Sequence, residues 1–233
     1  MKTIGIIGGM SWESSSVFYK AINQKIKVKL GDSHSAKCLM YSVDFAEIAP
    51  LQHTDNWDEL TIIMIDAARK LEKGGADFVV LCTNTMHKLA KEIEDNITIP
   101  FIHIADATAH AIKDSNVKKV GLLGTKFTME QDFFKTRILE KHNIETIIPN
   151  ENQREIVHNI IYEELVKGII NQESRKKFLE IIEDLIQQGA EGIILGCTEI
   201  SLLITNEYTN HLLFDTTEIY ATKAVELAVE GLN

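Results

Sequence analysis

Short apolar runs rich in Ile, Val and Leu alternate along the chain with longer segments in which apolar residues recur at helical spacing. Such runs are typical of strands buried in a parallel sheet, and such segments are typical of helices that cover it. We predict strands at 3–7, 37–43, 78–82, 100–104, 119–123, 144–148, 191–195 and 211–214. We predict helices near 14–29, 56–73, 85–95, 106–114, 128–141, 153–168, 173–187, 199–206 and 216–230. The expected fold class is therefore α/β.

The pattern of the first half returns in the second half. Two pairs of segments match when aligned on their glycines: 75–85 with 189–199, and 3–9 with 119–125. The first alignment sets Thr83 opposite Cys197. We therefore predict two pseudo-symmetric lobes from an internal duplication, each a four-stranded, mainly parallel sheet flanked by helices. Equivalent loops of such lobes can approach one ligand from opposite sides of a cleft.

The expected boundaries follow from the repeat. Residues 1–108 should form the first lobe, joined by a C-terminal helix within 209–233, and residues 109–208 should form the second. The 233 residues are 45% hydrophobic, which is enough to build buried cores.

Charge and cysteine spacing exclude several functions. The net charge is −10 and the basic residues are scattered, which argues against a nucleic-acid partner. No apolar run approaches the ~20 residues that span a bilayer, and no leader pattern is visible, so we expect a soluble, cytoplasmic protein without a membrane partner. Three cysteines without C-x-x-C spacing indicate neither a disulfide framework nor a metal site. The glycines at 5, 8 and 9 lack G-x-G-x-x-G spacing, which argues against a dinucleotide-binding site.

Four loops are the candidates for chemistry, because ligands of α/β sheets bind beyond the carboxyl ends of strands. They are residues 8–11, 83–87, 124–125 and 196–199, and each follows a predicted strand. Their equivalent places in the two repeats favour one shared site over four unrelated turns.

Cys197 is the strongest single candidate. A thiol at a strand-to-helix transition meets exposed amides and a positive helix end, which lower its pKa and favour a thiolate that can act as base or nucleophile. The alternative is a small buried apolar residue, which we prefer for Cys38 and Cys82. Thr83 occupies the mirrored position, but its hydroxyl does not ionise near neutral pH.

Polar neighbours of these two residues could bind a substrate. Asn84, Thr85 and Thr198 could hold a carboxylate together with backbone amides, and they could serve as ordinary helix caps at the same time. His87 and Glu199 could orient or protonate a neighbour, or could be solvated first-turn residues.

Three further residues carry weaker signals. Lys167, near the end of the helix 153–168, could reach a substrate carboxylate or could be a surface cation. Gln52, in the loop after strand 37–43, indicates little by itself. His103, on the strand 100–104, is typical of a core histidine.

The chain resembles the aspartate/glutamate racemase family, the cofactor-independent amino-acid racemases. The matching segments are Gly8-Gly-Met10, Asn84-Thr85-x-His87, Leu122-Leu-Gly-Thr125 and Gly196-Cys-Thr-Glu199. The resemblance covers essentially all 233 residues. It is closest to the branch with broad or L-aspartate/glutamate specificity, through segments such as Cys82-Thr-Asn-Thr-Met-His-Lys88 and His103-Ile-Ala-Asp-Ala-Thr108.

The resemblance implies a two-lobed homodimer without cofactor, in which one thiol on each side of the substrate Cα removes or returns the α-proton. The first family cysteine is Thr83 in this chain. Cys197 would then abstract the proton of an L-substrate, and Thr83 or water near it would reprotonate the opposite face.

The resemblance also assigns substrate contacts. Asn84, Thr85, Thr125 and Thr198 would hold the α-carboxylate and ammonium, with Met10 and Ser11 beside them; Gln52 and Lys167 would contact a side-chain carboxylate. The expected substrate is aspartate or glutamate. Two alternatives stay open: a decarboxylase or isomerase of the same superfamily, and a catalytically impaired amino-acid-binding protein.

Overall fold

Two separate parallel sheets are formed within residues 1–232, which the computed structural model describes. The first contains β1 (Ile4–Gly8), β2 (Cys38–Ser42) and β3 (Phe78–Leu81); the second contains β4 (Lys119–Gly124), β5 (Glu145–Ile147), β6 (Gly192–Gly196) and β7 (Leu212–Asp215). Their orders are β2-β1-β3 and β5-β4-β6-β7, and every pair is parallel. In both, the first strand along the chain lies between the second and the third. The predicted α/β class is confirmed.

The chain divides into two compact units. The first comprises Met1–Ile104 and the chain from Tyr220 onward, and the second comprises Ala105–Ile219. The boundary expected at 208/209 therefore falls at 219/220, because β7 pairs with β6 and belongs to the second unit. The boundary expected at 108/109 falls at 104/105.

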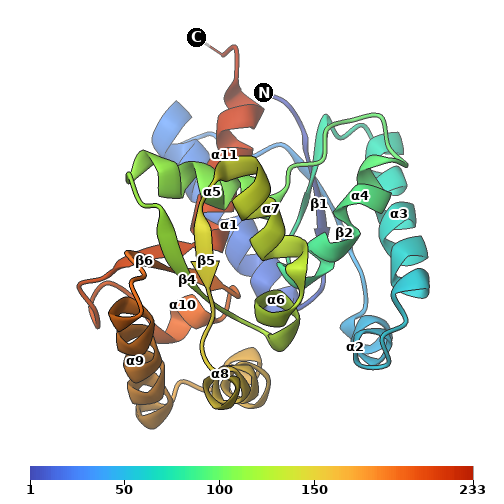
Figure 1. Cartoon of the computed structure of the whole chain (residues 1–233). Coiled ribbons are helices and arrows are strands. Elements are labelled where there is room, and N and C mark those ends of the chain that lie inside the picture. Colours follow the sequence, from blue (N-terminus) through green and yellow to red (C-terminus); the bar gives the residue numbers. More distant parts are fainter. Residues whose placement is uncertain (233) are drawn as a thin grey trace. The chain divides into compact units, whose positions relative to one another are not determined.

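Helices of the first unit cover a sheet whose β1 and β3 are fully buried. They are α1 (Trp12–Leu30), α2 (Phe45–His53), α3 (Trp57–Lys73), η1 (Thr85–Leu89), α4 (Ala90–Glu94) and, from Tyr220 on, α11 (Thr216–Val229). Helix α3 contacts β1 and β2, and α4 lies beside α3 (Figure 1). Leu60, Met64, Ala67 and Leu71 give α3 its buried stripe at helical spacing.

The second unit repeats this construction around β4 and β6. Its helices are α5 (Ile104–Asp114), α6 (Lys126–Glu130), α7 (Asp132–His142), α8 (Glu151–Glu163), η2 (Leu165–Lys167), α9 (Gln172–Gln187) and α10 (Ile200–Leu203). Helices α8 and α9 contact each other, and both contact β4 (Figure 1). Phe178, Ile181, Ile182 and Leu185 form the buried face of α9.

The turns into β3 and β6 are alike in atomic detail. Gly75 and Gly189 follow α3 and α9 with the same φ of 94°, a conformation that side chains with a Cβ rarely adopt. The amide of the next residue donates to the carbonyl oxygen five positions back, from Ala76 to Leu71 at 3.1 Å and from Ala190 to Leu185 at 3.0 Å. Both are Schellman turns. The glycines that aligned the repeat in the sequence therefore have the same structural task.

Two helix predictions need correction. Residues 45–53 were expected to be a loop but form α2, which begins where the Asp44 side chain accepts a hydrogen bond from the Ala46 amide. The helix contains Pro50 and is short, so the sequence carries little helical signal there. The single helix expected at 128–141 is divided into α6 and α7, because the backbone at Gln131 is extended with ψ of 153°.

The first sheet has three strands within residues 1–232, so the prediction of a fourth strand at 100–104 is wrong. Only an isolated bridge joins Phe101 to Val79. At the next position the Tyr220 hydroxyl lies between the two segments: it accepts the Leu81 amide at 3.1 Å and donates to the Ile102 carbonyl. The inserted hydroxyl replaces the backbone hydrogen bond that would have extended the ladder.

Candidate active site

The candidate residues follow the carboxyl ends of neighbouring strands in each unit. In the first unit β1 leads to Met10 and Ser11, and its partner β3 leads to Thr83. In the second unit β4 leads to Thr125, and its partner β6 leads to Cys197. Each unit therefore gathers its candidates at one edge of its sheet, where α/β proteins bind ligands.

Cys197 forms a pair with Glu199. The thiol Sγ donates a hydrogen bond to Glu199 Oε2 at 2.9 Å, and the Glu199 side chain is buried. A carboxylate in this position can accept the thiol proton or return it. Glu199 is thus a direct partner of the thiol and not a solvated first-turn residue.

The predicted direction of the Cys197 pKa is wrong. Burial, and then the neighbouring Glu199 carboxylate, raise the pKa of the thiol well above its ordinary value. Hydrogen bonds from the Glu199 and Thr198 amides act in the predicted direction but are outweighed. Helix α10 has only four residues, so its positive end is weak. These surroundings therefore favour the protonated thiol at neutral pH.

Tyr162 is a neighbour of this pair that the sequence did not suggest. It lies at the end of α8, and η2, which follows, contacts α10. Burial, together with the charges of Cys197 and Glu199, raises the pKa of Tyr162 to about 12. The phenol therefore keeps its proton and can act as a hydrogen-bond donor. Its ring packs on His158 with centroids 4.6 Å apart, and this i,i+4 spacing was the available signal.

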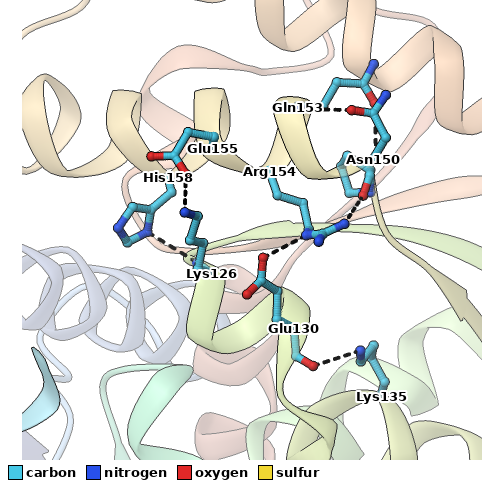
Figure 2. A network of polar contacts seen from close by, with 9 residues as sticks. Lys126, Glu130, Lys135, Asn150, Gln153, Arg154, Glu155 and His158 are labelled. Carbon is cyan, nitrogen blue, oxygen red and sulfur yellow. Dashed lines mark hydrogen bonds and ion pairs between the residues drawn. The ribbon is translucent and has the colours of Figure 1, made fainter. Parts of the chain in front are cut away.

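Helix α8 is fastened to the turn that carries Thr125. Figure 2 shows Lys126 between Glu155, which pairs with its ammonium, and His158, whose Nδ1 accepts its backbone amide at 3.3 Å. Arg154 Nε donates to Glu130 Oε1 at 2.8 Å at the other end of α6. Thr125 itself caps α6, because its hydroxyl accepts the Thr128 amide. This network fixes the Thr125 turn against the helix that bears Tyr162.

Thr83 is held through its backbone. Its amide donates to the Leu81 carbonyl at 2.9 Å, and its carbonyl accepts from His87 Nδ1 at 2.8 Å. His87 Nε2 accepts the Ile104 amide at 3.2 Å, so the two contacts together define one neutral tautomer. His87 is buried, and its ring lies 4.7 Å from that of the equally buried His103.

Four other candidates of the first unit are buried beside Thr83 or at the start of α1. Ser11 caps α1 by accepting the Ser14 amide, and Met10 precedes it. Asn84 and Thr85 are buried at the beginning of η1. Ser11 is therefore the N-cap of α1, a role that the sequence did not predict.

Gln52 and Lys167 have different surroundings. Gln52 lies buried on α2, and not in a loop as predicted; its amide nitrogen lies 3.1 Å from Met86 Sδ on η1. Lys167, on η2, is 54% exposed and pairs with Glu163 at 2.6 Å. The two lie in different units. Thr198, between Cys197 and Glu199, is half-buried.

Residues 1–232 contain neither a cluster of metal-binding side chains nor a helix that could span a membrane. No group of three or more His, Cys, Asp or Glu side chains in this part of the chain is arranged to hold a metal ion. Among the helices described, none has the length and apolar character needed to cross a membrane.

Known proteins match this chain along its whole length. A family model described as Asp/Glu/Hydantoin racemase matches residues 7–224. The broad specificity amino-acid racemase RacX of Bacillus subtilis (strain 168) is 28% identical over 227 residues, which cover 95% of this chain and 96% of RacX. The crystal structure of "a putative Asp/Glu Racemase" from Yersinia pestis is 49% identical with a TM-score of 0.93, covering 99% of this chain and 100% of that one. An aspartate racemase homologue from Pyrococcus horikoshii OT3 is 35% identical with a TM-score of 0.87, at 99% and 100% coverage.

Proposed function

Since the chain belongs to the Asp/Glu/hydantoin racemase family and is an amino-acid racemase, we propose that its substrate is an acidic amino acid, aspartate or glutamate. We assign Cys197 to the L-side and Thr83 to the opposite side of one substrate carbon, in a reaction that needs no cofactor. The resemblance of the loops and the equivalence of their positions in the two units support this assignment.

The observation that carries the proposal is the hydrogen bond from Cys197 Sγ to Glu199 Oε2 at 2.9 Å. An α-proton is weakly acidic, so its removal needs a positioned base. Glu199 supplies the acceptor that converts the protonated thiol into a thiolate at the moment of reaction. The half-buried phenol of Tyr162 stays protonated, and in this proposal it would donate a hydrogen bond to the thiolate as it forms.

The proton steps balance as follows in the direction from L to D. The Cys197 proton moves to Glu199, and the thiolate then removes the α-proton, leaving the electron pair on Cα and the α-carboxylate. A proton from the Thr83 hydroxyl, or from a water beside it, adds to the opposite face. Glu199 releases its proton to solvent, which restores the water or hydroxyl, and Cys197 keeps the substrate proton.

Neutral donors hold the reacting end of the substrate in this proposal. Asn84, Thr85, Thr125 and Thr198 would bind the α-carboxylate and ammonium, with Met10 and Ser11 beside them, and donors at the carboxylate stabilise the charge that develops there. Gln52 and Lys167 would contact the side-chain carboxylate. Lys167 can leave Glu163 at little cost, because exposed ion pairs contribute only about 0–1 kcal/mol.

Proton NMR in D₂O tests the proposal. We expect the Cα–H signal of L-aspartate or L-glutamate to disappear without loss of CO₂, and the D-enantiomer to form. Loss of CO₂ from a substituted malonate in place of this exchange would support a decarboxylase. Tight binding of either amino acid without exchange would support a binding protein. Either result would refute the proposed reaction.

Two cysteine variants locate the reacting thiol. Cys197→Ser should abolish exchange into L-substrates, whereas Cys82→Ser should leave most of it, because Cys82 is buried at the end of β3 and its pKa is raised by burial. Equal losses in the two variants would contradict the assignment.

The homodimer and the cytoplasmic location stay predictions. Analytical ultracentrifugation of the purified protein would test the first, and fractionation of the producing cells would test the second.

A further inference from the structure

The backbone of Thr83 is connected to two buried side chains through short chains of hydrogen bonds. On its amide side, Thr83 N donates to the Leu81 carbonyl, and Leu81 N donates to the Tyr220 hydroxyl. On its carbonyl side, Thr83 O accepts from His87 Nδ1. Both backbone groups of Thr83 are therefore fixed.

Both chains of hydrogen bonds end on the same short segment, residues 102–104. The Tyr220 hydroxyl donates to the Ile102 carbonyl, and His87 Nε2 accepts the Ile104 amide. The rings of Tyr220 and His87 also touch edge to face, with centroids 5.9 Å apart. Tyr220 is 1% exposed and His87 is 2% exposed, so water cannot easily replace either contact.

This geometry leaves His87 no free nitrogen for proton transfer. Nδ1 must carry a proton to donate to the Thr83 carbonyl, and Nε2 must lack one to accept from Ile104. A doubly protonated ring would point an N–H at the Ile104 N–H. A role in orientation is therefore favoured over a role in acid-base chemistry.

We propose that Tyr220 and His87 are positioning residues that hold the Thr83 hydroxyl where the second face of the substrate carbon is protonated. The inference rests on the proposed function. Tyr220 is distant in the sequence from Thr83, and it enters the first unit only through the C-terminal part of α11. Small displacements of a reacting group have large effects on rate, on the order of 10²-fold for 1 Å.

The experiment compares two rates in one NMR sample. Deuterium exchange into L-aspartate or L-glutamate requires only Cys197 and its partner Glu199, whereas formation of the D-enantiomer also requires the Thr83 side. In Tyr220→Phe, which removes only the hydroxyl, we expect the ratio of D-product formation to L-exchange to fall about tenfold. Exchange itself should stay within about twofold of the wild type, because Cys197 lies in the other unit.

The ratio of D-product formation to L-exchange distinguishes a loss of Thr83 positioning from a general loss of folded protein. Ile26→Val is the matched control, since Ile26 is fully buried on α1 in the same unit and belongs to neither chain of hydrogen bonds described above. A smaller folded fraction lowers both rates alike, so the ratio of D-product formation to L-exchange in Ile26→Val should equal that of the wild type. His87→Asn removes the imidazole that links the Thr83 carbonyl to the Ile104 amide, and it should lower this ratio even if Tyr220→Phe does not fold.

Two results would overturn the inference. Wild-type ratios in both Tyr220→Phe and His87→Asn would show that these residues only stabilise the fold, while the proposed racemase function would stand. Absence of both exchange and D-product in the wild-type protein would remove the proposed function and this inference with it.

Discussion

Replacing Glu199 with Gln separates the reactivity of Cys197 from its use in catalysis. The thiol Sγ lies 2.9 Å from Glu199 Oε2, and the carboxylate is one of the causes that raise the thiol pKa. Two unit charges 4 Å apart repel by about 4 kcal/mol at an effective dielectric constant near 20. Even a third of this energy, about 1.4 kcal/mol, changes the thiolate population about tenfold.

The Glu199→Gln variant should therefore be alkylated at Cys197 about tenfold faster than the wild type at pH 7. Its exchange into L-aspartate should nevertheless fall by about 10²-fold or more, because the amide cannot accept the thiol proton. A more reactive thiol in a slower enzyme is an unusual combination, and a simple loss of structure does not produce it.

The assay is alkylation by iodoacetamide, followed by mass spectrometry of the peptide that contains Cys197, beside NMR exchange on the same preparation. The Cys82 peptide is an internal control, since burial protects that thiol in both proteins. Unchanged alkylation of Cys197 would refute the electrostatic argument. Unchanged exchange would show that Glu199 is not the proton acceptor.

Three further predictions concern other parts of the chain. Burial raises the pKa of Cys82 in the folded protein, so above the ordinary thiol pKa the unfolded chain loses a proton that the folded chain keeps. The free energy of unfolding therefore falls by about 1.4 kcal/mol per pH unit in that range. Urea titrations from pH 8 to 10 should show that this free energy declines less steeply in Cys82→Ser than in the wild type. Thr83→Cys should raise exchange into D-aspartate about 10²-fold in the NMR assay, and an inert D-substrate would contradict the mirrored roles. Asp106→Asn should lower the urea-derived free energy of unfolding by about 2 kcal/mol, because Asp106 accepts two hydrogen bonds from Arg137 at 2.8 and 2.7 Å. Glu163→Gln removes one partner of an exposed ion pair and should change the same free energy by less than about 0.5 kcal/mol.

The sequence predicted the sheets well because buried parallel strands leave an unambiguous local signal. Seven apolar runs became strands whose ends lie within one residue of the expected bounds. The eighth run, at 100–104, is locally just as apolar, but the Tyr220 hydroxyl ends its pairing with β3. A contact made by a residue so far along the chain has no counterpart in a local pattern.

The sequence predicted that the candidate residues follow the ends of strands, but it did not predict the surroundings of their side chains. Glycines at equivalent turns located the loops of Thr83 and Cys197, because backbone geometry depends on local residue types. The sign of the Cys197 pKa depends on where the Glu199 side chain points and on how deeply the thiol is buried. Tyr162 was missed for the same reason, since helical spacing does not show which face of α8 lies toward Cys197 and Glu199.

The division of the chain also bears on how the protein is made. The second unit is one continuous stretch, whereas the first cannot be completed until Tyr220 has left the ribosome. A chain that has emerged only as far as residue 219 therefore has all three strands of the first sheet but lacks the C-terminal helix of that unit, whereas the second unit is complete. We expect nascent chains that end at residue 219, followed by a linker that fills the ribosome exit tunnel, to be cleaved by protease within residues 1–104 and protected within 105–219. The opposite pattern would contradict this order of assembly.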